Sequence, residues 1–283
     1  MTTKSFLLTW AARSGLRART VECYRSIICL HISPFIGSVP IDELRPDHIR
    51  TVLARAAGLS RTAELCYVVC RAALADLPGQ PMRGVSRPAH IQHTPEPWSD
   101  DQIAAYLAAL DGHPHGLALS LGIVCGLRRG EICGLRWSDV LWDEDTLLVV
   151  NQRIRLASGR LVDAPPKSRA GARPVPVPGP LMERLRASRQ LTGYIDDITP
   201  SGLDQAHRAL VARLGLPPIP LHGLRHTMAT ACIRHGGDMR ALQLLLGHAS
   251  YTTTAMRYTH PDRAMLRATI DAGSASCYTG VRG

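Results

Sequence analysis

Residues 126–139 read Gly-Leu-Arg-Arg-Gly-Glu-Ile-Cys-Gly-Leu-Arg-Trp-Ser-Asp, and this stretch decides the fold of the second half of the chain. It follows an apolar run that begins at Gly116 and predicts a buried helix. The Cys125-Gly126 pair predicts a break, and a second helix then carries Arg128 and Arg129. The apolar run, residues 116–127, is too short to cross a bilayer.

A strand-like pattern follows this helix pair. Residues 146–156 predict a strand, residues 157–159 a turn, and residues 160–164 a returning strand. Residues 173–177 predict a third strand, which its prolines place at a sheet edge. Helices are predicted before this region over residues 100–110, capped by Ser99, and after it from 181, over 204–214, 225–235 and 238–246, and from 252 onward.

The N-terminal part is helical in pattern and ends in a proline-rich stretch. Apolar residues recur at helical spacing over residues 5–77, which predicts about four short helices around a small core. Residues 78–98 contain five prolines and two glycines and are typical of a linker. The sequence therefore predicts two domains.

Four segments carry candidate chemical groups. They are the stretch with Arg128, the sequence Pro-Lys-Ser-Arg at 166–169, Leu-His-Gly-Leu-Arg-His-Thr at 221–227, and Leu-Gly-His-Ala-Ser at 246–250 followed by Tyr258 in Met-Arg-Tyr-Thr-His. Only two of the 33 basic residues are lysine, Lys4 and Lys167. Lysine can lose a proton near neutral pH in a tuned environment whereas arginine cannot, so Lys167 is a candidate acid or base.

In this order, the four segments resemble the tyrosine recombinase (phage integrase) family over about residues 99–272, and residues 5–77 resemble its helical core-site-binding domain. The resemblance implies a mainly α fold with a small antiparallel β-sheet, made of a SAM-like N-terminal domain and an α+β catalytic domain. It assigns residues 1–80 to the core-site DNA-binding domain, 81–98 to the linker, 99–272 to the catalytic domain and 273–283 to a flexible tail. It implies six catalytic residues: Arg128, Lys167, His222, Arg225, His248 and Tyr258.

The chemistry of these side chains suits cleavage of a DNA phosphodiester without metal or other cofactor. Tyr258 would attack to give a 3′-phosphotyrosine and a free 5′-hydroxyl, and the retained ester bond would allow religation without ATP. Arg128 and Arg225 would clamp the non-bridging oxygens with their planar donor forks. Lys167 would protonate the leaving oxygen, His222 would move a proton to or from the tyrosine, and His248 would donate a hydrogen bond to the phosphate.

Each residue also has a simpler reading. Arg128 can be a surface helix arginine, as Arg129 is expected to be, and His248 can merely end a helix. His222 and His226 have the spacing of a helical metal pair, but Gly223 stands where such a motif needs glutamate. Tyr251 and Tyr278 compete with Tyr258, although Tyr251 is too close to His248 for the family spacing. Glu131 and Asp139 are interpreted as structural partners of nearby arginines.

Composition agrees with a DNA-binding protein of a reducing compartment. The 283 residues carry a net charge of +10, divided equally between residues 1–98 and 99–283, which suits a polyanion that touches both domains. None of the eight cysteines forms a Cys-x-x-Cys pair, so most are expected to be buried and reduced. The N-terminus lacks a secretory pattern, and we expect a cytoplasmic protein without membrane association.

The expected partner is double-stranded DNA at short core attachment sites. The family resemblance implies a C-shaped clamp around the duplex and a homotetramer on two DNA sites. Arginines of the N-terminal domain are candidate contacts: Arg13, Arg17, Arg19, Arg25, Arg61 and Arg71. The chain enters these helices within its first residues, so no arm-binding domain is expected. The helix over residues 261–272 is expected either to dock on a neighbouring protomer or to pack within its own chain.

The reading favoured by the sequence is an integrase that inserts or excises a phage or mobile element, with a possible directionality factor. Three alternatives stay open: a recombinase of the Xer kind that resolves DNA dimers, a type IB topoisomerase-like enzyme, and a non-catalytic DNA-binding regulator. The sequence names neither the target site nor the direction of the reaction.

Overall fold

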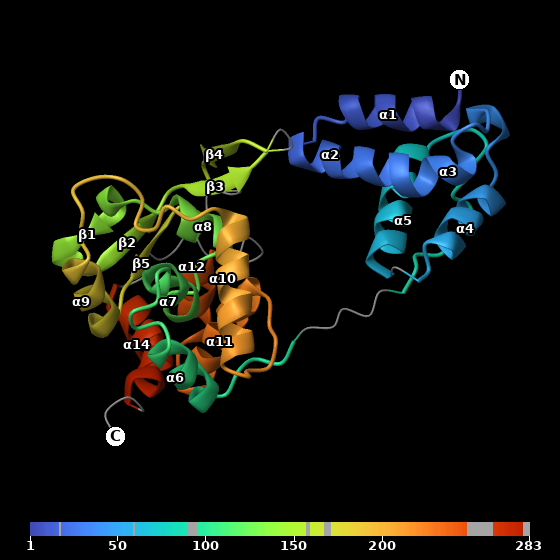
Figure 1. Cartoon of the computed structure of the whole chain (residues 1–283). Coiled ribbons are helices and arrows are strands. Elements are labelled where there is room, and N and C mark those ends of the chain that lie inside the picture. The colour runs from blue at the N-terminus through green and yellow to red at the C-terminus, as the bar shows by residue number, and fades with distance from the viewer. Residues whose placement is uncertain are drawn as a thin grey trace. The chain divides into compact units, whose positions relative to one another are not determined.

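The computed structural model describes residues 1–16, 18–58, 60–89, 95–156, 159–166, 171–247 and 263–279. Contacts within the chain divide it into two compact units, residues 1–94 and 95–283 (Figure 1). Among the described residues, every helix is too short or too polar to cross a bilayer.

The first unit is a helical domain with its own core. Its elements are α1 (Thr3–Arg13), α2 (Ala18–Ile27), the π-helical turn η1 (Ile28–Ile32), α3 (Ser33–Ile36), the 3-10 turn η2 (Ile41–Glu43), α4 (Pro46–Arg55) and α5 (Ser60–Leu74). Leu7, Ile28, Ile49 and Val69 are fully buried where these helices meet. Met82 and Val85 pack on the same core, so the start of the proline-rich stretch belongs to this unit.

The second unit combines helices with two small sheets. Its helices are α6 (Asp100–Ala108), α7 (Gly116–Val124), α8 (Arg129–Gly134), α9 (Gly179–Ala187), α10 (Pro200–Arg213), α11 (Leu221–Arg234), α12 (Met239–Leu246) and α14 (Arg263–Thr279), with 3-10 turns η3 (Trp137–Asp139) and η4 (Trp142–Glu144). Ser99 caps α6, accepting from the Gln102 amide while the Gln102 side chain accepts from the Ser99 amide. Trp98 is buried in this core and donates from its indole to the Pro217 carbonyl at 2.9 Å, which fixes the end of the linker.

The strands form two antiparallel sheets rather than one. A three-stranded sheet has the order β1 (Val140–Leu141), β2 (Thr146–Val149), β5 (Arg173–Pro176), and a hairpin joins β3 (Gln152–Arg155) to β4 (Leu161–Ala164). The single strand predicted over 146–156 is therefore wrong. It divides after Val149 because β2 pairs with β5 whereas β3 pairs with β4. β5 lies at a sheet edge, as its prolines predict.

Helix α14 packs against the rest of the second unit. Leu266 and Ile270 are buried in the core, and α14 lies beside α11 and α6 (Figure 1). In this chain the described part of the last helix thus packs in cis, and docking on a neighbouring protomer stays a prediction. Residues 273–279, expected in a flexible tail, continue this helix. Gly273 lies close against the core, since a Cβ there would lie 2.3 Å from the Cys232 sulfur.

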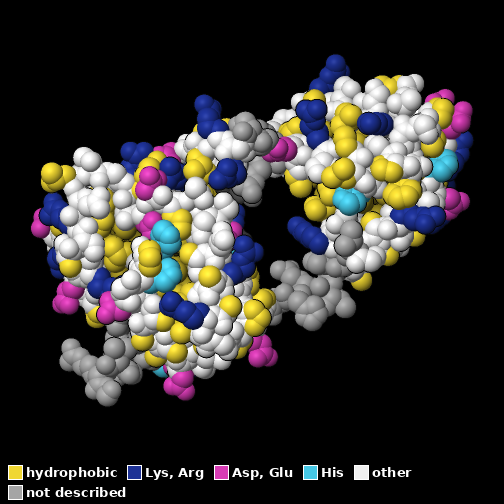
Figure 2. Space-filling model, in the orientation of Figure 1, with side chains coloured by type: hydrophobic (Ala, Val, Ile, Leu, Met, Phe, Trp, Pro, Cys, Tyr) yellow, Lys and Arg dark blue, Asp and Glu magenta, His cyan; other side chains and the backbone are white. Residues whose placement is uncertain are grey.

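The positions of the charged side chains and of most cysteines agree with what the composition predicts. Arginine and lysine side chains are spread over the visible face of each unit among acidic ones (Figure 2). Of the seven described cysteine side chains, five are buried and two, Cys23 and Cys29, are exposed. Burial raises the pKa of the Cys125 and Cys133 thiols to about 12, so these act as small apolar core residues.

Candidate active site

The break between α7 and α8 positions Arg128. Gly126 adopts the left-handed conformation (φ 61°), which turns the chain sharply after the buried helix. Arg128 is the N-cap of α8, and its backbone N–H donates to Glu131 Oε2 at 2.9 Å. Its guanidinium donates to Glu131 Oε1 at 2.7 Å and to the Gly247 carbonyl at 3.1 Å. The side chain stays 37% exposed, so part of this donor fork faces solvent.

Arg225 lies on α11, is buried, and interacts electrostatically with Arg128. Its Nη1 donates to the Gly126 carbonyl at 2.8 Å, and its Nη2 donates to the Leu246 carbonyl. Burial, followed by the positive charges of Arg128 and Arg173, lowers the pKa of Arg225 to about 9. Positive charge is therefore crowded at this point, and an anion would relieve it.

Glu131 is the buried carboxylate that holds this cluster together. Arg173 of β5 donates to Oε1 at 3.2 Å and to Oε2 at 3.0 Å, the same two oxygens that accept from Arg128. Burial acts to raise the pKa of Glu131, but the bonds from Arg173 and Arg128 outweigh it and hold that pKa below its usual range. Glu131 is thus ionised and fully used by arginines, as predicted for a structural partner. Asp139 similarly accepts from the backbone N–H of Arg136 at 2.9 Å.

Three consecutive carbonyls at the end of α12 each accept from a different arginine. Leu245 accepts from Arg173, Leu246 from Arg225, and Gly247 from Arg128. A helix C-terminus carries partial negative charge on such carbonyls, which favours this convergence. Within the described residues, three guanidinium groups therefore share one helix end directly before His248, and two of them, those of Arg128 and Arg173, also share the Glu131 carboxylate.

His222 lies at the exposed surface of α11, one turn before His226. Partial burial, then the His226 ring and the charges of Arg225 and Arg128, lower its pKa, so the imidazole is neutral near pH 7 and can accept a proton. Gly223 makes this helix start possible, because a Cβ there would lie 2.9 Å from Ile219. The two histidine rings pack edge to face with centroids 5.1 Å apart. Among the described residues, no third histidine, cysteine or carboxylate joins them in a metal-binding group.

The structure brings together three of the six expected catalytic residues: Arg128, His222 and Arg225. Lys167, His248 and Tyr258 lie outside the described residues, as does Arg17. Arg129 pairs with Asp204 of α10, as expected for a surface arginine.

Among the candidate DNA contacts of the first unit, Arg25 and Arg71 are exposed, and the side chain of Arg19 lies outside the described set. Arg61 is 65% exposed and bonds to Glu64 at 2.5 Å, and Glu64 also holds Arg87. The hydrogen bonds from Arg87 and Arg61 lower the pKa of Glu64. Each of these two arginines keeps further N–H groups open to solvent.

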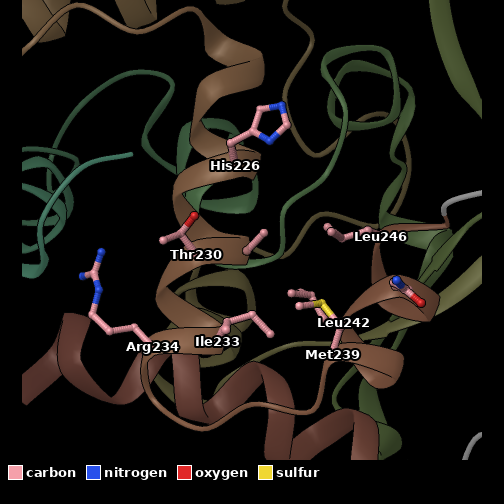
Figure 3. A pocket seen from close by; sticks show the side chains of 9 residues that line it. His226, Thr230, Ile233, Arg234, Met239, Leu242 and Leu246 are labelled. Atoms are coloured by element: carbon pink, nitrogen blue, oxygen red, sulfur yellow. The ribbon is translucent and has the colours of Figure 1, made fainter. Parts of the chain in front are cut away.

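A groove of about 470 Å³ lies beside the arginine cluster, between α11 and α12 (Figure 3). His226 stands at one end, and Ile233, Met239 and Leu242 make its lining largely apolar (Figure 3). The groove contains neither Arg128 nor Arg225, so the cluster and not the groove is the candidate anion site.

Comparison with known proteins identifies the family. The profile of the phage integrase family matches residues 195–265, and that of the phage integrase N-terminal SAM-like domain matches residues 4–55. Tyrosine recombinase XerD of Neisseria meningitidis serogroup B is 30% identical over 202 residues, which are 67% of this chain and 67% of that protein. The chain belongs to the tyrosine recombinase family. Its members are site-specific DNA recombinases.

Other relatives of this tyrosine recombinase are matched over different shares of their length. XerC of Xylella fastidiosa (strain 9a5c) is 27% identical over 290 residues, 91% of each chain. The XerC-like recombinase of Caldanaerobacter subterraneus is 27% identical over 196 residues, and the match spans 58% of this chain and 50% of that protein.

Solved structures confirm the fold class. The Tn1549 transposon integrase in complex with transposon right end DNA aligns with a TM-score of 0.75 at 20% identity, over 96% of this chain and 99% of that one. A lambda integrase dimer bound to a COC′ core site aligns with a TM-score of 0.66 at 20% identity, over 93% and 99%. The mainly helical architecture with small antiparallel sheets is that of these integrases.

Sequence reasoning missed Arg173 as a member of the recombinase site. Its signal is the period of two in β5: Arg173 shares a face with Val175, which is fully buried, as is Val177 beyond the strand. A charged residue on the inward face of a strand must have partners, and here they are Glu131 and the Leu245 carbonyl.

Proposed function

We propose that this tyrosine recombinase cleaves and rejoins duplex DNA at a specific core site through a 3′-phosphotyrosine on Tyr258. The convergence of Arg128 and Arg225 at the end of α12 is the observation that supports it most. Their two forks lie at one point where positive charge exceeds negative charge among the described residues. A phosphodiester placed there would receive charge-assisted hydrogen bonds that strengthen as the pentacoordinate state forms.

In the proposed reaction, the Tyr258 hydroxyl attacks the scissile phosphorus while its proton passes to the neutral His222. The bond to the 5′ oxygen breaks, and Lys167 supplies the proton that this oxygen takes. His248, the residue after the Gly247 carbonyl that Arg128 holds, donates to a non-bridging oxygen. Reversal of these steps by a 5′-hydroxyl of another strand rejoins DNA without external energy.

The proposed partner is a pair of double-stranded DNA core sites bound by a homotetramer. We propose Arg17, Arg19, Arg25, Arg61 and Arg71 of the first unit as DNA contacts, most of them to phosphates. Because its proposed substrate is DNA of the host cell, we propose that the protein acts in the host cytoplasm. The biological role proposed is integration or excision of a phage or mobile element, with a directionality factor setting the direction.

Resolution of DNA dimers is the second candidate role. It is supported by relatives named XerC and XerD, one of which is matched over 91% of its length. Both roles use the same strand-cleavage chemistry.

The test is covalent trapping on a library of nicked duplexes in EDTA. Wild type is expected to give protein–DNA adducts that survive SDS, Tyr258→Phe to give none, and the matched control Tyr251→Phe to give wild-type yield. Sequencing of the trapped DNA identifies the core site. Sequence-specific binding by wild type without any adduct would overturn the proposal in favour of a DNA-binding regulator.

A further inference from the structure

Arg173 is an arginine whose three guanidinium nitrogens all donate to groups of the protein. Its Nε donates to the Leu245 carbonyl, Nη1 to the Gly171 carbonyl at 2.9 Å, and both Nη atoms to Glu131. Its side chain is only 6% exposed. A side chain so enclosed, with all three nitrogens bonded inside the protein, does not reach DNA directly, so its part in the reaction must be indirect.

The partners of Arg173 belong to two different parts of the site. Glu131 carries Arg128, through one bond to its guanidinium at 2.7 Å and one to its backbone at 2.9 Å. The Leu245 carbonyl precedes the two carbonyls that hold Arg225 and Arg128. Arg173 therefore joins the start of α8 to the end of α12, and Arg225 lies between them.

We propose that Arg173 is a positioning residue for strand cleavage; this rests on the function proposed above. Through Glu131 it fixes the direction of the Arg128 fork. Through the Leu245 carbonyl it fixes the end of α12, from which the chain continues to His248. Arg173 thereby fixes the position of the proposed phosphate-binding residue Arg128 relative to the start of the segment that leads to Tyr258.

The planar fork of arginine is what this role requires. Nε and the two Nη atoms point in fixed directions and reach a carbonyl on one side and a carboxylate on the other. A lysine at 173 keeps the charge opposite Glu131 but has a single nitrogen, so it cannot also hold the Leu245 carbonyl in the same geometry. Arg173→Lys should therefore retain Arg128 and release α12, whereas Arg173→Gln weakens both connections.

Arg184 provides a matched control in the same unit. It lies on α9, is partly buried, and donates to the Ser120 hydroxyl and to the Leu110 carbonyl, both at 3.1 Å. Its loss removes two arginine hydrogen bonds from the fold, against four for Arg173, without touching the residues of the arginine cluster. Arg184→Gln thus reports the effect of lower stability alone.

The experiment is single-turnover cleavage of a nicked core-site duplex by the full chain, at saturating DNA and well below the lowest Tm. DNA affinity is measured separately by fluorescence anisotropy. Arg173→Gln is expected to cleave about 100-fold more slowly, the scale of a small misplacement of reacting groups, with DNA affinity within about threefold of wild type. The cleavage rate of Arg173→Lys is expected to lie between those of wild type and Arg173→Gln, and Arg184→Gln is expected to cleave at the wild-type rate. Glu131→Gln should slow cleavage too, and the double variant Arg173→Gln/Glu131→Gln should lose less than the product of the single losses.

Wild-type cleavage rates in both folded Arg173 variants would overturn the proposal. So would equal slowing by Arg173→Gln and Arg184→Gln, because the effect would then follow stability. If Arg173→Gln does not fold, Arg173→Lys and Glu131→Gln carry the same comparison, and wild-type rates in both refute it. Failure of the proposed function is a different result, namely no cleavage by wild type itself.

Discussion

Replacement of Ile270 by alanine tests the cis packing of α14. Ile270 is fully buried in the core of the second unit, beside Leu266. The substitution removes three buried carbon groups worth about 0.8 kcal/mol each, and the cavity left behind adds a further term. We expect a loss of about 3 kcal/mol in the free energy of unfolding. For a unit the size of residues 95–283, this corresponds to a fall in Tm of about 6–12 °C.

The assay is thermal unfolding of the full chain without DNA, followed by circular dichroism at low protein concentration. Ala268→Ser on the exposed face of the same helix is the control and should stay within about 0.5 kcal/mol of wild type. If α14 instead docks on a neighbouring protomer, the isolated chain keeps its Tm in Ile270→Ala and only assembly on DNA suffers. A Tm within about 2 °C of wild type would therefore refute the cis packing.

Three further perturbations are predicted. His207 is buried, accepts from the Tyr106 hydroxyl and donates to the Ile219 carbonyl, and burial lowers its pKa. The free energy of unfolding should therefore fall as pH drops below about 6.5, by at most about 1.4 kcal/mol per pH unit. This loss should be smaller in His207→Gln. Gly126→Ala forces a left-handed residue and puts a Cβ 2.1 Å from Met228 Cε, so it should cost about 1–2 kcal/mol in backbone strain alone and slow cleavage; a wild-type Tm would contradict this. Arg61→Ala should weaken DNA binding and lower the salt dependence of log K by about one, and unchanged affinity and slope would remove Arg61 from the DNA contacts.

Local signals were sufficient for the helices. The left-handed turn at Gly126 and the cap at Ser99 depend on residues close in sequence, so both could be predicted. The division between β2 and β3 depends on which partner each half meets, and β5 lies more than twenty residues away from β2. The packing of Gly273 on Cys232 is a tertiary contact that a polar composition conceals, so the sequence alone does not predict that the last helix continues to Thr279.

The candidate site also contains residues that local sequence predicts and one residue that it does not. Arg128 and Arg225 stand in ordered motifs, and the structure brings both to the end of α12. Arg173 was hidden because 31 of the 33 basic residues are arginine, so an extra arginine carries little signal. Only its position on the inward face of β5 distinguishes it, and its partners Glu131 and Leu245 are distant in sequence.

The proposed function depends on the linkage of Tyr258 to the 3′ phosphate of the cleaved strand. The direct measurement is mass spectrometry of peptides from the nuclease-digested adduct, with kinase labelling of the released DNA end. We expect a nucleotide phosphate on the peptide that contains Tyr258 and a released strand that accepts label without phosphatase treatment, as a free 5′-hydroxyl does. A nucleotide on Tyr251 or on any other residue, or a released strand with a 5′ phosphate, would contradict it.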